Sequence, residues 1–104
     1  MPGFKIYRNN SASSERYPFL VDVQSELLSS LETRLAIPLV LQAVMAGAGI
    51  RNLNPTTEIN QAVYLVLTQQ MASVPKRVLG EEMEGLSVDR NQILSSIDFL
   101  TTGI

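Results

Sequence analysis

The chain has 104 residues, of which 45% are apolar and 17% are charged, and its net charge at neutral pH is −2. This length favours a single domain with one hydrophobic core over residues 1–104. The basic residues are scattered rather than clustered, which argues against a protein that binds nucleic acid directly. Cysteine and histidine are absent, so disulfides and thiolate or imidazole catalysis are excluded, and a protein zinc site would need only oxygen ligands. We therefore expect no metal and no cofactor.

The longest apolar stretch covers residues 37–50 and is interrupted by Pro38 and Gln42. A membrane helix needs about 20 apolar residues, so this stretch is expected to be core or interface. The first ten residues lack the apolar segment of a signal peptide. The sequence thus predicts a cytoplasmic protein with no membrane segment. Its low charge fraction indicates that part of its surface is covered by a partner or by a second copy.

In the first quarter of the chain, residues 3–8 alternate apolar and polar side chains and predict a strand. The polar residues 9–16 are typical of a loop. Residues 17–25 alternate again, so we expect a second strand that pairs with the first as a hairpin.

The next segment, residues 26–33, is expected to be a connection that exposes the pair Leu27 and Leu28. Residues 34–41 predict a third strand. Proline cannot donate a ladder hydrogen bond, so Pro38 should lie at a sheet edge or a bulge. Residues 42–55 are ambiguous, with a short helix possible at 43–45 and glycines at 47 and 49 that disfavour a longer one.

Two short strands that turn near Asn60 are predicted over residues 56–68, the second of them covering 62–68. A bend at Pro75 and a last strand ending at Gly80 follow. Residues 81–86, with Glu81, Glu82 and Glu84, have the composition of an acidic turn.

A single helix is predicted at the end of the chain, from Val88 to Thr101, with Ser87 as its N-cap and Asp89 favouring the positive end of the helix dipole. An apolar stripe runs along it through Ile93, Ile97 and Leu100, with Leu94 beside it. Gly103 can end the helix in a left-handed conformation. Five to seven strands and one C-terminal helix predict an α+β, mainly antiparallel β fold, with a small barrel-like sheet.

Candidate catalytic groups are few. The glutamates of residues 81–86 together with Asp89 could form a cation site, but they lack the regular oxygen spacing of a calcium loop and suit a solvated turn. Residues 47–49 resemble a phosphate-binding loop only weakly, because no strand–helix context surrounds them. The serines have no histidine to activate them. We expect a protein that is not an enzyme.

Several segments in order along the chain resemble the CcdB family of toxins. They are FKIY near the start, FLVDVQSELL, IPL, MASVP, LGEEMEGLS and the final RNQILSSIDFLTTGI. The similarity runs from Phe4 to Ile104 and is poor over residues 40–63. It implies an SH3-like barrel fold shared with the MazF-type ribonucleases, with one C-terminal helix in each subunit of a homodimer.

The resemblance also implies a function. A CcdB-like protein is the toxin of a type II toxin–antitoxin system; it binds the A subunit of DNA gyrase, traps the cleaved gyrase–DNA complex, and is neutralised by a CcdA-like antitoxin. The expected gyrase-binding residues match the last helix, its end and a second apolar patch: Asn91, Asp98, Thr101, Thr102, Gly103, Ile104, Leu27 and Leu28. The family pattern ends in Trp-Gly-Ile, so Thr102 stands where an aromatic is usual, and Thr101 replaces a second aromatic. The antitoxin-binding residues remain unknown.

Two alternatives remain open. A MazF-like endoribonuclease of the same fold would need a base and an acid at the phosphate, such as Asp22 or Glu15 with Arg16 or Arg34. The acidic balance of the chain argues against it. A dimeric interaction module that keeps the fold but has lost toxicity through Thr102 is the second alternative.

Overall fold

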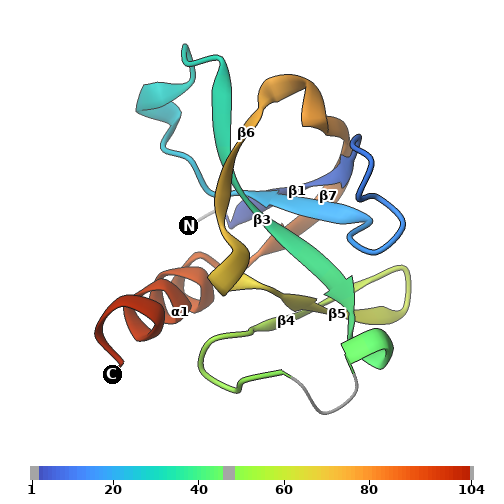
Figure 1. Ribbon diagram of the computed structural model, residues 1–104, viewed down its shortest axis with the longest axis vertical. Helices are drawn as coiled ribbons and strands as arrows, with labels where there is room; N and C mark the ends of the chain where they lie inside the picture. Colours follow the sequence, from blue (N-terminus) through green and yellow to red (C-terminus); the bar gives the residue numbers. More distant parts are fainter. Residues whose placement is uncertain (1–2, 46–48, 104) are drawn as a thin grey trace.

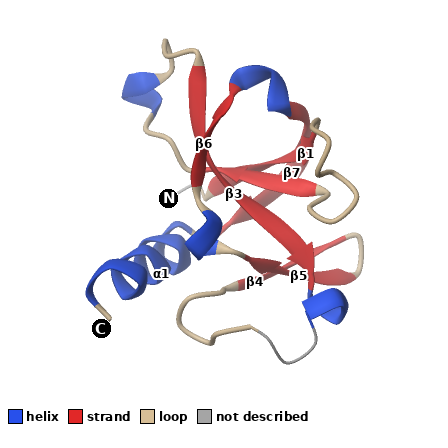
Figure 2. Cartoon of the chain, viewed as in Figure 1, coloured by secondary structure: helices blue, strands red, loops and turns tan. Residues whose placement is uncertain are grey.

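A computed structural model of the protein describes residues 3–45 and 49–103 (Figure 1). These residues form one strongly bent antiparallel sheet and one C-terminal α-helix, as Figure 2 shows by colour. The sheet is a half-barrel with the strand order β4-β5-β3-β2-β1-β7, and β6 pairs with β3 beside this path. The strands are β1 (Phe4–Asn9), β2 (Phe19–Asp22), β3 (Thr33–Leu41), β4 (Thr56–Ile59), β5 (Ala62–Val66), β6 (Ala72–Pro75) and β7 (Leu79–Val88). The expected α+β, mainly β fold is confirmed.

The core lies inside the bend of the sheet. Alternating residues of β1 point into it, because side chains of a strand alternate between its two faces. Its buried members are Phe4, Ile6, Phe19, Val21, Ile37, Leu39, Ile59, Val66, Val88 and Ile93. The predicted hairpin of the first two strands is confirmed, with Ile6 opposite Val21.

The third strand is central rather than peripheral. It pairs with β2 along one side, and on its other side it pairs with β6 through residues 33–36 and with β5 through residues 39–41. Pro38 lies at the junction between these two partners, and its carbonyl accepts a hydrogen bond from Leu67 N at 3.0 Å. The expectation of a sheet edge or a bulge is therefore wrong, because a change of partner strand at Pro38 tolerates the missing N–H.

The predicted hairpin at Asn60 is confirmed. Strands β4 and β5 are joined by Asn60 and Gln61, whose φ angles of 52° and 70° are both positive. Two positive φ angles match a two-residue turn that follows the right-handed strand twist. Strand β5 ends at Val66, two residues before the predicted end, and the 3₁₀ helix η3 (Thr68–Gln70) follows.

The prediction of an acidic turn at residues 81–86 is wrong, because strand β7 continues through this segment to Val88. Two cations of β1 lie opposite its glutamates: Lys5 Nζ is 3.8 Å from Glu82 and Arg8 Nε is 3.4 Å from Glu81. Gly85, with φ of 79°, lies where the register between β1 and β7 shifts. The segment has a bulge rather than a turn.

Helix α1 (Arg90–Thr102) begins two residues later than predicted. Its N-cap is Asp89, whose Oδ1 accepts hydrogen bonds from Asn91 N at 2.7 Å and Gln92 N at 3.2 Å. Ser87 is not the cap, since it belongs to β7 and pairs with Lys5. The buried Val88, opposite Phe4 in the sheet, keeps the strand extended up to the start of the helix.

Three further 3₁₀ helices connect the strands: η1 (Glu26–Leu28), η2 (Gln42–Met45) and η4 (Lys76–Val78). The short helix predicted at 43–45 is confirmed as η2. Gly47 and Ala48 of the predicted glycine loop lie outside the described residues. None of the helices formed by the described residues has the length and apolar character needed to cross a bilayer.

Candidate functional site

Helix α1 presents an exposed polar face over its whole length. Asn91, Asp98 and Thr102 are spaced i, i+7 and i+11 and therefore lie on one side of the helix. All three are on the accessible side of the fold, as is Thr101 beside them. The C-terminal end of the helix extends away from the sheet (Figure 1). Four of the residues expected to bind gyrase thus share one accessible surface.

The end of α1 is held in a defined conformation. Gly103 has φ of 75° and ψ of 15°, and its N–H donates to the carbonyl of Phe99 at 2.9 Å. Glycine favours this left-handed backbone conformation because it has no Cβ, whereas other residues are strained at a positive φ angle. A Cβ on Gly103 would meet no described atom within 4 Å. Gly103 is exposed, and Ile104 lies outside the described residues.

The two threonines before Gly103 use their hydroxyls within the helix. Thr101 Oγ1 donates to the carbonyl of Ile97 at 3.0 Å, and Thr102 Oγ1 donates to that of Asp98 at 2.7 Å. Such bonds back to the helix compete with bonds to a partner. A protein that docks here meets short side chains whose hydroxyl protons already have acceptors.

The second predicted patch is an exposed apolar turn. Leu27 is 93% exposed and Leu28 is 49% exposed. The turn is fixed from both sides: Gln24 Nε2 donates to the carbonyl of Leu28 at 2.8 Å, and Lys76 Nζ donates to that of Ser29 at 2.9 Å. Exposure of these leucines is therefore a feature of an ordered turn.

A cavity of about 460 Å³ lies between the two patches. One wall is the start of α1 with Arg90 and Leu94, and the opposite wall is the segment 22–26, which leads directly into Leu27. Tyr7 also lines it; burial, together with the charges of Glu82 and Asp22, raises the pKa of this phenol. The start of α1 and the segment before the leucine turn thus line the same cavity, although Leu27 and Leu28 themselves do not line it.

The predicted apolar stripe of α1 is only partly core. Ile93 is buried and Ile97 packs partly against the core, but Leu94 is 46% exposed and Leu100 is 41% exposed. The helix extends beyond the sheet, so its last turns have no sheet beneath them (Figure 1). Leu94, Leu100 and Arg90 are candidate surface residues that sequence reasoning missed, since periodicity shows an apolar face but not what covers it.

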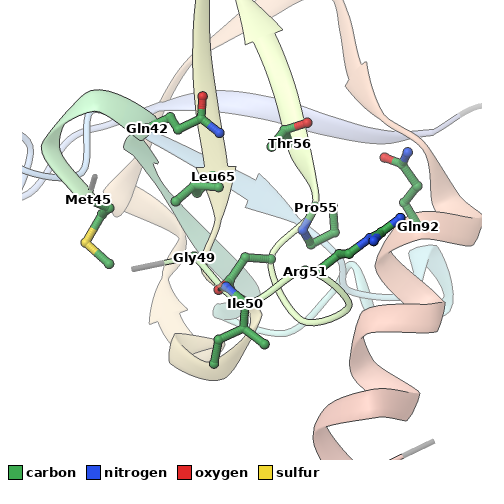
Figure 3. Close-up of a pocket in the computed structure, with 10 residues that line it drawn as sticks. Gln42, Met45, Gly49, Ile50, Arg51, Pro55, Thr56, Leu65 and Gln92 are labelled. Carbon is green, nitrogen blue, oxygen red and sulfur yellow. Dashed lines mark hydrogen bonds between the residues drawn. The ribbon is translucent and has the colours of Figure 1, made fainter. Parts of the chain in front are cut away.

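A second cavity, of about 490 Å³, borders the opposite flank of α1. Gln92 lines it, and Gln92 is two residues from Arg90, which turns it about 200° around the helix. Figure 3 shows Arg51 reaching from the neighbouring loop toward Gln92, with Met45 and Leu65 on the far wall. None of the described residues that line this second cavity is acidic.

Two of the residues considered for ribonuclease chemistry, Asp22 and Arg34, are paired with each other, whereas Glu15 and Arg16 are exposed on the β1–β2 loop. Arg34 donates to Asp22 Oδ2 through Nε at 3.0 Å and Nη2 at 2.7 Å, and both side chains are 10% exposed. Asp22 Oδ1 accepts from Gln24 N at 3.1 Å. Arg16 lies on the β1–β2 loop, over the Tyr17 ring at 5.6 Å, and its hydrogen bond lowers the pKa of that phenol.

Within the described part of the chain, no three His, Cys, Asp or Glu side chains are grouped closely enough to hold a metal ion. Two of the glutamates considered for a cation site, Glu81 and Glu82, instead face cations of β1.

A comparison with protein families identifies the family of this chain. Residues 3–103 match the model of the CcdB family, described as CcdB protein. The match includes the whole sheet, the leucine turn and α1 up to Gly103. The chain therefore belongs to the CcdB family, whose members are gyrase-targeting toxins of toxin–antitoxin systems and act as gyrase poisons rather than as catalysts.

Proposed function

We propose that this chain is a toxin that binds the A subunit of DNA gyrase and traps the cleaved gyrase–DNA complex. The contact surface is the exposed face and end of α1, with Asn91, Asp98, Thr101, Thr102, Gly103 and Ile104, together with Leu27 and Leu28 of the leucine turn. A CcdA-like antitoxin neutralises it.

One observation supports the proposal most: α1 extends beyond the sheet and ends in an exposed, left-handed Gly103. A helix end without a side chain at its last described residue allows close approach of another backbone. The ordered, outward-facing Leu27 adds an apolar contact that is worth about 2 kcal/mol when fully covered.

Binding at Thr102 differs from the usual family pattern. An aromatic there would stack on a partner arginine, which contributes about 0.5–2 kcal/mol. Threonine has no ring, and the hydroxyl of Thr102 already donates to Asp98. We infer that the glycine–isoleucine end and the leucine turn carry a larger share of the affinity in this chain.

Trapping requires unequal affinity for two states of gyrase. A ligand that binds the resting and the DNA-cleaved enzyme equally changes neither population. The toxin must therefore bind more tightly to the open, cleaved state, in which a narrow helix end can enter between the two A subunits.

The active form is proposed to be a homodimer. Leu100 leaves apolar area exposed near the end of α1, which a second copy of the chain would cover. A two-fold dimer presents the same surface twice, which suits the paired A subunits of gyrase. The antitoxin, folding on binding, would cover a further surface.

The ribonuclease alternative has no comparable support, since Asp22 and Arg34 form a mutual, buried ion pair. A general base must be able to reach its proton in the substrate.

The test is a cleavage assay with purified gyrase, supercoiled DNA and ATP. The proposed function predicts that linear DNA, covalently attached to the gyrase A subunit, builds up and is released by protein digestion. A matched incubation with total RNA should leave the RNA intact. Cleaved RNA together with unaffected gyrase would support the ribonuclease instead, and no effect on either would support the non-toxic module.

A further inference from the structure

The Nε of the Arg90 guanidinium lacks a polar partner. This nitrogen is buried, and no described residue accepts a hydrogen bond from it. The salt bridges formed by the described residues involve Lys5, Arg8 and Arg34 but not Arg90. A buried donor without an acceptor is costly, so it needs an explanation, and an acceptor supplied from outside the chain, by water, an ion or a partner, is one.

The orientation of Arg90 is nevertheless fixed. Its Cζ lies 4.4 Å from the centroid of the Phe4 ring, the closest of the cation–aromatic contacts in the described residues. Phe4 is buried and belongs to the core. The Phe4 ring covers one face of the guanidinium and fixes its orientation. The N–H donors lie along the edge of the guanidinium and can bind another group.

Arg90 also lines the cavity of about 460 Å³ between α1 and the segment 22–26. Two acidic side chains line this cavity: Asp22 is already paired with Arg34, and Glu26 is exposed and has no ion pair among the described residues. The pKa of Tyr7, on the same wall, is raised by burial and by nearby carboxylates, so this phenol stays a neutral donor. Lys5, Tyr7 and Arg90 are side chains of the cavity that can donate to an incoming carboxylate, whereas Glu26 opposes it.

The position of Arg90 connects it with the proposed gyrase surface. Arg90, Leu94 and Thr101 are spaced i, i+4 and i+11 on one flank of α1. The other wall of the cavity leads into Leu27. A partner large enough to touch both the helix end and the leucine turn can also reach this cavity, which borders α1 and the segment before Leu27.

We propose that Arg90 is a specificity residue that binds a carboxylate, from an aspartate or glutamate side chain on the gyrase A subunit, by two parallel hydrogen bonds. This inference rests on the proposed function. Planar, two-point recognition is available to arginine but not to lysine. Leu94 and the aliphatic part of Arg90 provide the apolar surround that strengthens such a pair.

The test measures the dissociation constant for the purified gyrase A subunit with four proteins: the native chain, Arg90→Gln, Arg90→Lys and Arg51→Gln. Arg51→Gln removes the same charge from the cavity on the opposite flank of α1 and serves as the matched control. We expect binding to weaken at least about tenfold in Arg90→Gln, by a smaller factor in Arg90→Lys, and less than about twofold in Arg51→Gln.

A further readout follows the ¹⁵Nε–Hε resonance of Arg90 by NMR during titration with the gyrase A subunit. A shift of this resonance is expected when the guanidinium gains a carboxylate partner. If Arg90→Gln folds poorly, the native chain is compared with Arg90→Lys instead, because lysine keeps the positive charge and the aliphatic part of the side chain. If the native chain and both Arg90 variants bind gyrase with equal affinity, the inference about Arg90 is wrong, but the proposed function is not affected. Equal weakening in Arg90→Gln and Arg51→Gln also overturns it, because net charge then explains the effect. A native chain that does not bind gyrase overturns the proposed function and this inference together.

Discussion

The hydroxyl oxygens of Thr68 and Ser96 lie 2.9 Å apart in the interior, and this contact connects the 3₁₀ helix η3 with α1. Both residues are fully buried, and Ser96 Oγ also donates to the carbonyl of Ile93 at 2.8 Å. With that donor used, Thr68 must be the donor between the two hydroxyls. The contact anchors the first half of α1, from which the exposed second half extends.

This arrangement predicts unequal costs for two substitutions. Ser96→Ala leaves the Thr68 hydroxyl proton buried without an acceptor and should lower the free energy of unfolding by about 1–3 kcal/mol. Thr68→Val leaves Ser96 bonded to Ile93 and should cost less than about 1 kcal/mol. Urea denaturation followed by circular dichroism measures both. Equal costs, or a larger cost for Thr68→Val, would show that the donor assignment is wrong.

The Asp22–Arg34 ion pair should be important for stability. Asp22→Asn leaves the buried guanidinium without its counter-charge, which costs about 3–5 kcal/mol. The exposed pair of Lys5 and Glu82, at 3.8 Å, is the control, and Glu82→Gln should cost less than about 1 kcal/mol. Thermal unfolding at neutral pH separates the two. A fully stable Asp22→Asn that has lost an RNA-cleaving activity would instead support the ribonuclease.

Gly103 should matter for binding beyond its effect on stability. Gly103 and Gly85 both have positive φ, and a Cβ on either meets nothing within 4 Å. Alanine at each position should therefore destabilise the fold similarly, by about 1 kcal/mol. Only Gly103→Ala should also weaken the binding of the gyrase A subunit, because a methyl group there blocks close approach. Calorimetric titration of both variants checks this, and an equal effect of the two on gyrase would remove Gly103 from the contact surface.

An aromatic at position 102 should raise the affinity for gyrase. Thr102→Trp restores the side chain usual in the family and is expected to tighten binding by about 2- to 30-fold through stacking on an arginine. Position 102 is exposed, so the fold should tolerate the change. The same substitution at the exposed Ser95, on the same helix, provides the control. Unchanged affinity in Thr102→Trp would mean that this chain docks on a surface other than the one its family implies.

Leu27 should contribute to binding without contributing to stability. Leu27→Ser removes a side chain that is 93% exposed, so the free energy of unfolding should hardly change. Gyrase affinity should fall by about tenfold if the leucine is covered in the complex. Val44→Ser, at a position that is 56% exposed on η2, is the matched control. A similar loss of gyrase affinity in both variants would indicate that exposed apolar side chains bind gyrase nonspecifically.

Much of the fold follows from local patterns in the sequence. The β1–β2 hairpin, the Asn60 turn and the C-terminal helix were predictable because alternation and helical periodicity reflect one-sided burial. Strand β7 was not, since Glu81, Glu82 and Glu84 have a loop-like composition. Their place in a strand depends on Lys5 and Arg8, which are distant in sequence and lie across the sheet.

The candidate site was predictable in part. The resemblance located α1 and the leucine turn, but it gave no reason to consider Arg90. The role inferred for that residue depends on its contact with Phe4, 86 positions earlier in the chain. The exposure of Leu94 likewise depends on where the sheet ends beneath the helix, which periodicity cannot show.

The proposed function requires that the end of α1 hold gyrase in its DNA-cleaved state. The most direct measurement compares the native chain with a variant that ends at Thr102, in a gyrase cleavage assay with supercoiled DNA. We expect the native chain to accumulate covalent gyrase–DNA complexes. The shortened chain should keep its circular dichroism spectrum and oligomeric state but accumulate none. Undiminished accumulation by the shortened chain would contradict the proposed function.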